Sequence, residues 1–272
     1  MLALASIGVQ AKQTIRVNND VTTHLVLPEN IKLVDISTTR LLGNQCADNI
    51  VRLKPSLDDP ETAGEYYEDE SMGTVTVICE RHIIQYDVVY VGNRSDATSI
   101  YNVSYEEMTD YQNPEVSMPS AEMARYAWAI YTSPRKSHRV IGKNHGMTAI
   151  LNNIYTIGNY FFIDYTLENK TSIPYEIDEV RVKLTDKKEV KATNSQTIEL
   201  EPVFSLNEAT SFKKNYRNVL VLDKLTFPEE KILQLEISES QISGRVLTLK
   251  IKYNDILSAD GIDESVMSNL KR

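Results

Sequence analysis

The sequence predicts a mainly β protein with two antiparallel β-sandwich-like domains, joined by a linker that contains a short helix. Three observations predict this fold class. Strand-like stretches in which apolar and polar residues alternate dominate the 272 residues, as is typical of sheets packed on one side. The sequence shows no long alternation of strands and helices, so a parallel α/β sheet is not expected. Polar, turn-forming segments flank one helical pattern and separate two groups of strands.

The clearest strand pattern lies at residues 160–168. It places two sets of side chains on opposite faces: Phe161, Ile163, Tyr165 and Leu167 on one, and Tyr160, Asp164 and Thr166 on the other. The same period of two runs through residues 81–91, 180–185 and 247–253. Val, Ile, Tyr and Thr at this period favour half-buried strands. A composition of 42% hydrophobic and 25% charged residues is that of a globular chain with a packed core.

The domain boundaries follow from two polar segments. Residues 109–119 are proline-bearing, and residues 134–146 are basic and glycine-bearing. The predicted organisation is a signal-peptide remnant at 1–12, an N-terminal β-sandwich domain at 13–110, a linker at 111–145 with a helix at 120–132, a C-terminal β-sandwich domain at 146–258 and a tail at 259–272.

The predicted helix starts with Ser120 as its N-cap and stops before Pro134. Met123, Ala127 and Ile130 form one apolar stripe, which Ala124, Trp128 and Tyr131 widen. Aromatic residues at helical spacing more often belong to a core than to a ligand site. We therefore expect this stripe, with the single tryptophan of the chain, to pack against a neighbouring sheet.

A phrase with a central proline occurs twice, at residues 21–37 and 224–238. Pro28 and Pro228 lack an amide hydrogen, so neither can donate to a central strand ladder. The phrase predicts a strand, a proline-acidic turn and a second strand that re-enters the sheet. His24 aligns with Lys224, so no catalytic group recurs, and this phrase is interpreted as a folding corner whose flanking strands could also form a docking edge.

Charge excludes some partners. A net charge of −9 and a pI near 5.1 argue against direct nucleic-acid binding, which needs a basic face. The basic run at residues 133–139 is interpreted as a solvated loop. The acidic segment at residues 56–73 lacks the spacing and central glycine of an EF-hand, so a solvated loop is favoured over a calcium site.

The N-terminus predicts export. Residues 1–13 read MLALASIGVQAKQ, a short apolar run that ends in Val9-Gln10-Ala11, as a signal-peptide cleavage site requires. The basic n-region of the signal peptide is missing, and a buried first strand is the alternative. The run is shorter than the ~20 residues of a membrane-spanning helix. Cys46 and Cys79 are too few for a disulfide scaffold, and both a disulfide between them and free thiols remain open.

The sequence contains none of the common catalytic or cofactor-binding motifs. HExxH, CxxC, GxSxG, GxxxxGK[ST] and GxGxxG do not occur. Cys79 and His82 are three residues apart, which in a strand puts side chains on opposite faces, and His138 with His145 is a weak pair for a metal. The sequence therefore predicts a protein that is not an enzyme, with no catalytic, cofactor-binding or metal-binding residues and no cofactor.

Several longer segments of the chain resemble segments of known protein families. The order of TTHLVLPENIKLVDIS, NIVRLKPSL and GTVTVICERHIIQYDVVY resembles the N-terminal half of TrbG/CagX-type outer-membrane core components of type IV secretion systems. The phrases at residues 168–202 and 216–257 resemble the TraN family of Bacteroides-type conjugative transposons. The resemblance covers nearly all of the chain after the N-terminal run.

This resemblance implies a structural component of a conjugation (mating-pair formation) channel in the periplasm at the outer membrane. The implied partners are other channel proteins in an oligomeric assembly, and membrane association would come through those partners. An alternative is an exported β-sandwich binding module, an adhesin or glycan-binding protein, which would need an exposed aromatic platform. The 15 tyrosines leave this open, although most lie within strand patterns.

Overall fold

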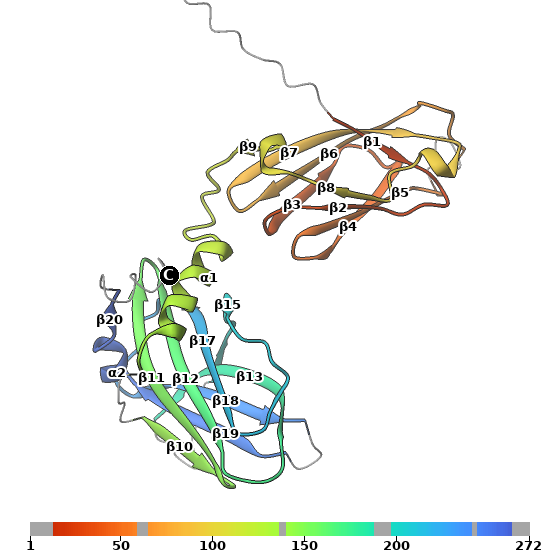
Figure 1. Cartoon of the computed structure of the whole chain (residues 1–272). Helices are drawn as coiled ribbons and strands as arrows, with labels where there is room; N and C mark the ends of the chain where they lie inside the picture. The colour runs from red at the N-terminus through yellow and green to blue at the C-terminus, as the bar shows by residue number, and fades with distance from the viewer. Residues whose placement is uncertain (1–12, 59–64, 136–139, 188–196, 241–243, 263–272) are drawn as a thin grey trace, which may run out of the picture. The chain divides into compact units, whose positions relative to one another are not determined.

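The structure is a computed structural model and describes residues 13–58, 65–135, 140–187, 197–240 and 244–262. It is mainly β, as the sequence predicts, and divides into two compact units, Met1–Ser120 and Ala121–Arg272 (Figure 1). Each unit has its own hydrophobic core between two sheets. The predicted signal-peptide remnant at residues 1–12 lies outside the described residues.

The first unit is a sandwich of two sheets, here called the β6 sheet and the β5 sheet. The β6 sheet has the order β1 (Thr14–Val17), β7 (His82–Tyr90), β6 (Ser71–Cys79) and β3 (Ile31–Ile36), with β9 (Thr109–Asp110) also on β7. The β5 sheet has the order β4 (Leu41–Ala47), β5 (Ile50–Pro55), β2 (Thr23–Val26) and β8 (Ile100–Asn102). Most neighbours are antiparallel, while β1 with β7 and β2 with β8 run parallel. Two one-turn 3₁₀ helices, Arg94–Asp96 and Tyr105–Glu107, lie in the connections.

The core of the first unit follows the period of two along its strands. In β7, the predicted apolar face is buried: Ile84, Tyr86, Val88 and Tyr90. These side chains meet Val75 and Val77 of β6 and, from the opposite sheet, Leu25, Val51 and Leu53. Each buried residue of this size contributes about 1.5–3 kcal/mol through removal of apolar surface from water.

The second unit is also a sandwich, formed by the β12 sheet and the β18 sheet. The β12 sheet has the order β10 (Ile141–Asn144), β11 (Met147–Ile157), β12 (Tyr160–Asn169), β17 (Asn215–Asp223) and β15 (Phe204–Ser205), with β20 (Asp260–Gly261) on β11. The β18 sheet has the order β14 (Ile198–Leu200), β13 (Tyr175–Asp186), β18 (Lys231–Glu239) and β19 (Val246–Lys252), with β16 (Ser211–Phe212) on β13. The short helix α2 (Tyr253–Leu257) follows β19.

Strand β12 is buried on both faces. Its apolar face, from Phe161 to Leu167, joins the core between the two sheets as predicted. Its other face, with Phe162, Asp164 and Thr166, is buried as well, because helix α1 (Ser120–Thr132) lies over it (Figure 1). The ring of Tyr126 on α1 meets Phe162 edge-on at 6.2 Å between centroids.

Helix α1 has the predicted bounds, but two details differ from the prediction. Ser120 is the first helical residue rather than the N-cap, and its N–H and hydroxyl donate to the buried carboxylate of Glu80 at 2.9 and 2.7 Å. Met123, Ala127 and Ile130 are buried as expected, whereas Trp128 is 54% exposed. The prediction that Trp128 packs against a sheet was therefore wrong. Ala129, one residue further on, is buried in its place.

The linker predicted at residues 111–145 does not form a separate body. Its first part belongs to the first unit, which ends at Ser120, whereas the rest of α1, from Ala121, and β10 belong to the second unit. Of the predicted tail, Asp260 and Gly261 form β20, and residues 263–272 lie outside the described residues. No helix of the described residues is both long and apolar enough to cross a lipid bilayer.

The two proline corners have the same place in the two sandwiches. The first leads from β2 in the β5 sheet to β3 in the β6 sheet, and the second leads from β17 in the β12 sheet to β18 in the β18 sheet. Leu27 and Phe227 are buried just before the two prolines, which are exposed. The strand after each corner thus enters the opposite sheet, and does not re-enter the same one. Of the two strands that flank the first corner, β2 lies inside its sheet and only β3 is an edge strand.

Candidate functional site

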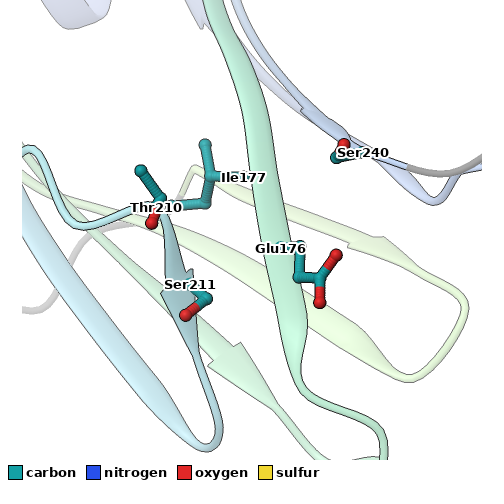
Figure 2. A pocket seen from close by; sticks show the side chains of 5 residues that line it. All are labelled: Glu176, Ile177, Thr210, Ser211 and Ser240. Carbon is teal, nitrogen blue, oxygen red and sulfur yellow. The ribbon is translucent and has the colours of Figure 1, made fainter.

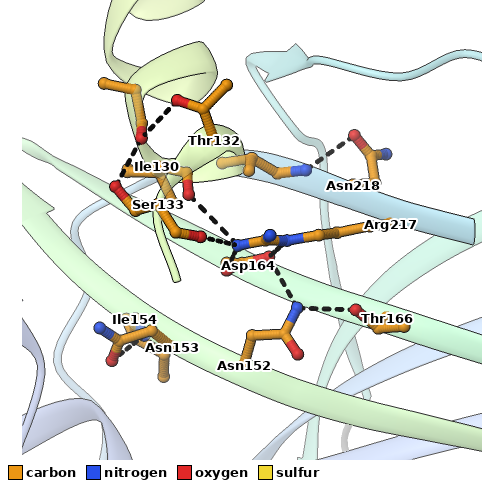
Figure 3. A network of polar contacts seen from close by, with 12 residues as sticks. Ile130, Thr132, Ser133, Asn152, Asn153, Ile154, Asp164, Thr166, Arg217 and Asn218 are labelled. Atoms are coloured by element: carbon orange, nitrogen blue, oxygen red, sulfur yellow. Dashed lines mark hydrogen bonds and ion pairs between the residues drawn. The ribbon is translucent and has the colours of Figure 1, made fainter. Parts of the chain in front are cut away.

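A buried ion pair lies between the β12 sheet and helix α1 (Figure 3). The guanidinium of Arg217, on β17, donates to both carboxylate oxygens of Asp164, on β12, from Nε at 2.9 Å and from an Nη at 2.7 Å. The side chains are 12% and 3% exposed. Two parallel hydrogen bonds between charged groups fix the orientation of a guanidinium far better than a single contact does.

A β-bulge in β11 supplies the next contact to Asp164. The pairing of β11 with β12 shifts between Leu151 and Asn153, which turns the buried side chain of Asn152 toward β12. Its amide nitrogen donates to Asp164 Oδ1 and to the hydroxyl of Thr166, each at 2.8 Å. Because the aspartate accepts hydrogen bonds from both sides, its charge is compensated in a buried site.

Arg217 also holds the end of α1. Its Nη donates to the backbone carbonyls of Ile130 and Ser133, at 3.2 and 3.3 Å, and its guanidinium lies 5.3 Å from the centre of the Tyr131 ring. The last carbonyls of a helix have no partners within the helix and carry partial negative charge. A cation at this position satisfies them, so Asp164, Arg217 and the end of α1 form one rigid unit, here called the clamp.

The clamp carries an exposed aromatic pair. Tyr131 stacks on Trp128, with 5.7 Å between ring centroids and 16° between ring planes, and Trp128 is the exposed member. We call these two side chains the aromatic plate. Trp, Tyr and Arg are the residues that most often dominate protein–protein binding energy. Here Arg217 of the buried ion pair contacts Tyr131, and Tyr131 contacts the exposed ring of Trp128. These contacts keep the outermost ring ordered before any partner binds.

The groups considered for catalysis do not form a reactive pair. Cys79 is buried at the end of β6, and burial, with the carboxylates of Glu29 and Glu80 nearby, raises the pKa of its thiol to about 12. The thiolate is the nucleophile of cysteine chemistry and is scarce at neutral pH at this position. The ring nitrogens of His82 face carboxylates: Nδ1 lies 2.9 Å from Glu29 and Nε2 lies 3.2 Å from Asp110.

The other two described histidines, His24 and His145, belong to different units. His145, with φ of 47°, and Gly146, with φ of 74°, form the two-residue turn between β10 and β11, a turn type that requires two positive φ angles. His138 lies outside the described residues, and His24 lies on β2. Within the described ranges, no group of three or more His, Cys, Asp or Glu side chains is placed to hold a metal ion.

The acidic segment at residues 56–73 is described except for residues 59–64. Its carboxylates bind groups of the first unit. Glu68 accepts a hydrogen bond from the N–H of Gly92 at 2.6 Å, and Glu70 pairs with Arg40 at 2.8 Å and accepts from the N–H of Tyr67. These contacts tie the described part of the segment to the sandwich.

A hollow of about 290 Å³ lies where β13 changes partners, from β18 to β16. Figure 2 shows its side chains arriving from three separate segments: Glu176, Ile177, Thr210, Ser211 and Ser240. Three hydroxyls and a carboxylate line it, with no imidazole or thiol among these five side chains to activate a hydroxyl as a nucleophile. The hollow is best explained by the divergence of the strands.

The two cysteines are not joined. Cys46 is an exposed thiol on β4, and Cys79 is a buried thiol on β6. Asn169, which begins the Asn-Lys-Thr triplet at residues 169–171, is buried. Its side chain donates to the carbonyl of Ile173 at 2.7 Å and accepts from the N–H of Thr171 at 2.9 Å. Its side chain therefore shapes a turn.

The clamp and the plate were missed by reasoning from the sequence. One signal was present, since Asp164 is the one charged residue within the apolar and aromatic run from Tyr160 to Leu167. A carboxylate at such a position needs a cationic partner. Nothing in the local sequence identifies that partner as Arg217, 53 residues further on.

Together, these features define a mainly β protein of two sandwich units, the second of which starts with a clamped helix and an exposed aromatic plate. The chain belongs to the family described as Domain of unknown function (DUF4138), whose model matches residues 120–261, more than half of the chain. The match begins at the first residue of α1 and ends at the last residue of β20. Helix α1, the clamp and the plate therefore belong to the family domain. None of the curated proteins compared with the chain matches it.

Proposed function

We propose that this chain is a non-enzymatic structural component of a conjugative type IV secretion (mating-pair formation) apparatus. It assembles with other channel proteins in the periplasm at the outer membrane and thereby supports DNA transfer. It reaches the periplasm through an N-terminal signal peptide, associates with the membrane through its partners, and does not bind the transferred DNA directly.

The observation that carries the proposal is the aromatic plate. Tryptophan and tyrosine are among the residues that most often dominate protein–protein binding energy, and stacking on Tyr131, with 5.7 Å between ring centroids, orders the exposed ring of Trp128. The clamp beneath it uses a buried ion pair, whose removal from water is expensive. A clamp that supports an exposed aromatic plate suits a protein that holds a binding partner in a fixed orientation.

The sequence supplies the biological setting. The phrases that resemble the TraN family of Bacteroides-type conjugative transposons lie at residues 168–202 and 216–257, inside the family domain at 120–261. The second phrase includes Arg217 on β17, and the first begins at the end of β12, four residues after Asp164. The resemblance and the plate thus concern the same domain.

The test is a transfer assay. The gene is deleted in frame from its conjugative element and replaced with the wild type or with Trp128→Ala. We expect the deletion to abolish transfer and Trp128→Ala to lower it about tenfold or more, because truncation of a central aromatic anchor removes about 2 kcal/mol or more of binding free energy. Tyr67→Ala, which removes a 78% exposed ring from the first unit, is the matched control and should transfer normally.

Envelope fractions from the same strains separate assembly from other defects. Wild-type and Tyr67→Ala protein should co-purify with channel proteins after crosslinking, and Trp128→Ala protein should be present at normal abundance but not co-purify. Undiminished transfer in the deletion strain would refute the proposal. Normal co-purification of Trp128→Ala protein would show that the plate is not the docking site.

The plate also favours a second candidate, an exported glycan-binding module, because a flat exposed ring is the surface on which sugar rings stack. Trp128 has one face on Tyr131, which leaves its other face for a ligand. A glycan array read with wild-type protein and with Trp128→Ala distinguishes the two. Binding of a glycan that is lost in the variant, in a strain whose transfer is normal, would support the second candidate.

A further inference from the structure

The exposed edges of the sheets differ in how they resist pairing with another strand. An unpaired edge is a template for strand addition, and proteins blunt it with short strands, charges or proline. Among the described edge strands, β8, β9, β14, β15, β16 and β20 have two or three residues. Charged side chains are present on the longer ones: Arg16 on β1, Lys32 and Asp35 on β3, Lys143 on β10, and Lys250 and Lys252 on β19.

Strand β4 is the exception. It has seven residues, LLGNQCA, with no charge and no proline, and it is exposed from Leu42 to Ala47. It ends the β5 sheet and pairs only with β5. The edge of this sheet is therefore long and uncharged, in contrast to the blunted edges elsewhere in the described chain.

The backbone groups that face outward on β4 follow from its register. Ser56 donates to the carbonyl of Arg40 at 2.8 Å, and Leu41 stands opposite Pro55, which has no N–H. Residues along an antiparallel ladder alternate between bonded and non-bonded pairs. The N–H and carbonyl groups of Leu41, Gly43 and Gln45 therefore point away from β5. Leu41 is buried, so an added strand would meet those of the exposed Gly43 and Gln45.

The outer face of the β5 sheet next to this edge is cationic. Arg52 and Lys54 of β5 share this face, and His24 of β2 is the cross-strand partner of Arg52. Nε of Arg52 donates to the side-chain carbonyl of Asn44 at 3.0 Å, which holds the guanidinium toward β4. Within the described residues, neither Arg52 nor Lys54 makes an ion pair, although carboxylates outnumber basic groups in the chain.

The surface is also hollowed beside β4. A cavity of about 510 Å³ is lined by six residues of three strands or their ends: Thr22, Leu42, Gly43, Asn44, Arg52 and Lys54. Leu42 is 56% exposed at its rim. The hollow thus combines an apolar side chain, an amide and two cations.

We propose that β4 and this cationic face form a docking surface for an extended, acidic peptide segment of a partner protein, which adds to the β5 sheet alongside β4. Backbone hydrogen bonds to Gly43 and Gln45 supply the pairing. Carboxylates at alternate positions of the partner strand meet Arg52 and Lys54, and supply the selection. The surface belongs to the first unit, outside the family domain, and does not depend on the function proposed above.

The first test uses the full chain and two fluorescein-labelled peptides of about ten residues. One alternates glutamate with valine and threonine, and the other has lysine in place of each glutamate. We expect the glutamate peptide to bind about tenfold tighter or more at low ionic strength, with affinity that falls as salt rises. Equal affinity for the two peptides, or no binding of the glutamate peptide, would overturn the proposal.

Charge variants locate the contact. The double variant Arg52→Glu/Lys54→Glu should lose about tenfold or more in affinity for the glutamate peptide. The matched control is Arg16→Glu, which reverses an exposed strand arginine on the β6 sheet and should bind as the wild type does. A similar loss in Arg16→Glu would mean that the peptide responds to overall charge, and would contradict a specific surface.

Edge variants test strand addition. Gln45→Pro removes an N–H that points outward and should abolish binding, whereas Gln45→Ala should retain it. Gly43 is avoided, because a Cβ there would lie 2.7 and 2.8 Å from Ile36 Cδ1 and Leu53 Cδ2 and would disturb the core. Circular dichroism establishes that Gln45→Pro is folded, and deuterium exchange should show protection of β4 amides when the wild type binds the peptide. Binding without that protection would rule out strand addition.

Discussion

The outer faces of two sheets, the β12 sheet and the β5 sheet, place an arginine in different surroundings. Both carry arginine on a central strand, Arg217 on β17 and Arg52 on β5. Arg217 lies under α1, paired with Asp164, and is mostly buried. Arg52 is exposed, contacts the neutral Asn44 and makes no ion pair among the described residues.

The difference shows how surroundings decide the role of the same side chain. A buried cation needs a fixed anion, so Arg217 serves the structure and orders the plate above it. An exposed cation needs no partner to fold, so Arg52 is available to select one. Substitutions on these two faces should therefore reduce the unfolding free energy more when the substituted side chain is more deeply buried.

The largest effect is expected for Asp164→Ala. It leaves the guanidinium of Arg217 buried without its anion, which costs about 3–5 kcal/mol of unfolding free energy. Denaturant titration of the full chain, followed by fluorescence of Trp128, reports on this unit because Trp128 is the single tryptophan. The double variant Asp164→Leu/Arg217→Met should recover part of the loss. A double variant no better than Asp164→Ala would show that charge burial is not the cause.

An intermediate effect, dependent on pH, is expected at Glu239. The guanidinium of Arg245 donates to its carboxylate and holds the pKa of Glu239 below its ordinary value of 4.5. A lowered folded-state pKa stabilises the fold above the unfolded-state pKa, and this contribution is lost as pH falls through the folded-state value. The stability difference between wild type and Glu239→Gln should thus be constant from about pH 7 to pH 5 and shrink below that.

The control for this prediction is Glu179→Gln. Glu179 pairs with Arg181 on the surface, where both side chains are nearly half exposed, so solvent weakens the pair. Its pH profile should follow the wild type more closely than that of Glu239→Gln. The reverse order, measured by urea denaturation across the same pH range, would contradict the ranking by burial.

Trp128→Ala should cost about 1 kcal/mol, the approximate worth of an aromatic stacking contact. The ring is more than half exposed and rests on Tyr131, so little core is lost. Thermal unfolding followed by circular dichroism measures the change. A loss above about 3 kcal/mol, typical of a buried tryptophan, would mean that Trp128 is a core residue after all.

The smallest effect is expected for Arg52→Ala and Lys54→Ala. Each should change the unfolding free energy by less than about 0.5 kcal/mol, as is usual for surface substitutions. The measurement is the same denaturant titration. A larger loss in either would show that these cations serve the fold of the first unit and weaken their assignment to a docking surface.

The sequence predicted the sheets better than it predicted the surface. Period-two patterns identified the buried face of β7 and the core-facing side of β12, because alternation of side chains is a local property of a strand. They did not predict that helix α1 also buries the other face of β12. The bounds of α1 followed from Ser120 and Pro134 for a similar reason. The orientation of Trp128 did not follow from the sequence, because the apolar stripe of the helix is wider than the face that the sheet covers.

Most of the candidate site could not be predicted from the sequence. The clamp joins Asn152, Asp164 and Arg217 with the end of α1 at Ile130, and it depends on a bulge and on the order of strands in the sheet. The edge position of β4 depends on the same order. Periodicity fixes which face a residue occupies, whereas neighbours across a sheet are set by topology.

The proline corners have a consequence for how the chain folds. Each joins two strands that lie in opposite sheets, so no local hairpin can form there. Strand β3 instead pairs with β6, as in Leu33 with Ile78, and β17 pairs with β12, as in Val221 with Phe162. Contacts so distant in sequence slow folding to milliseconds or longer. A chain that reaches its compartment unfolded would pass through a stage in which many strand edges are still open, and partners or chaperones present at that stage would influence which edges remain so.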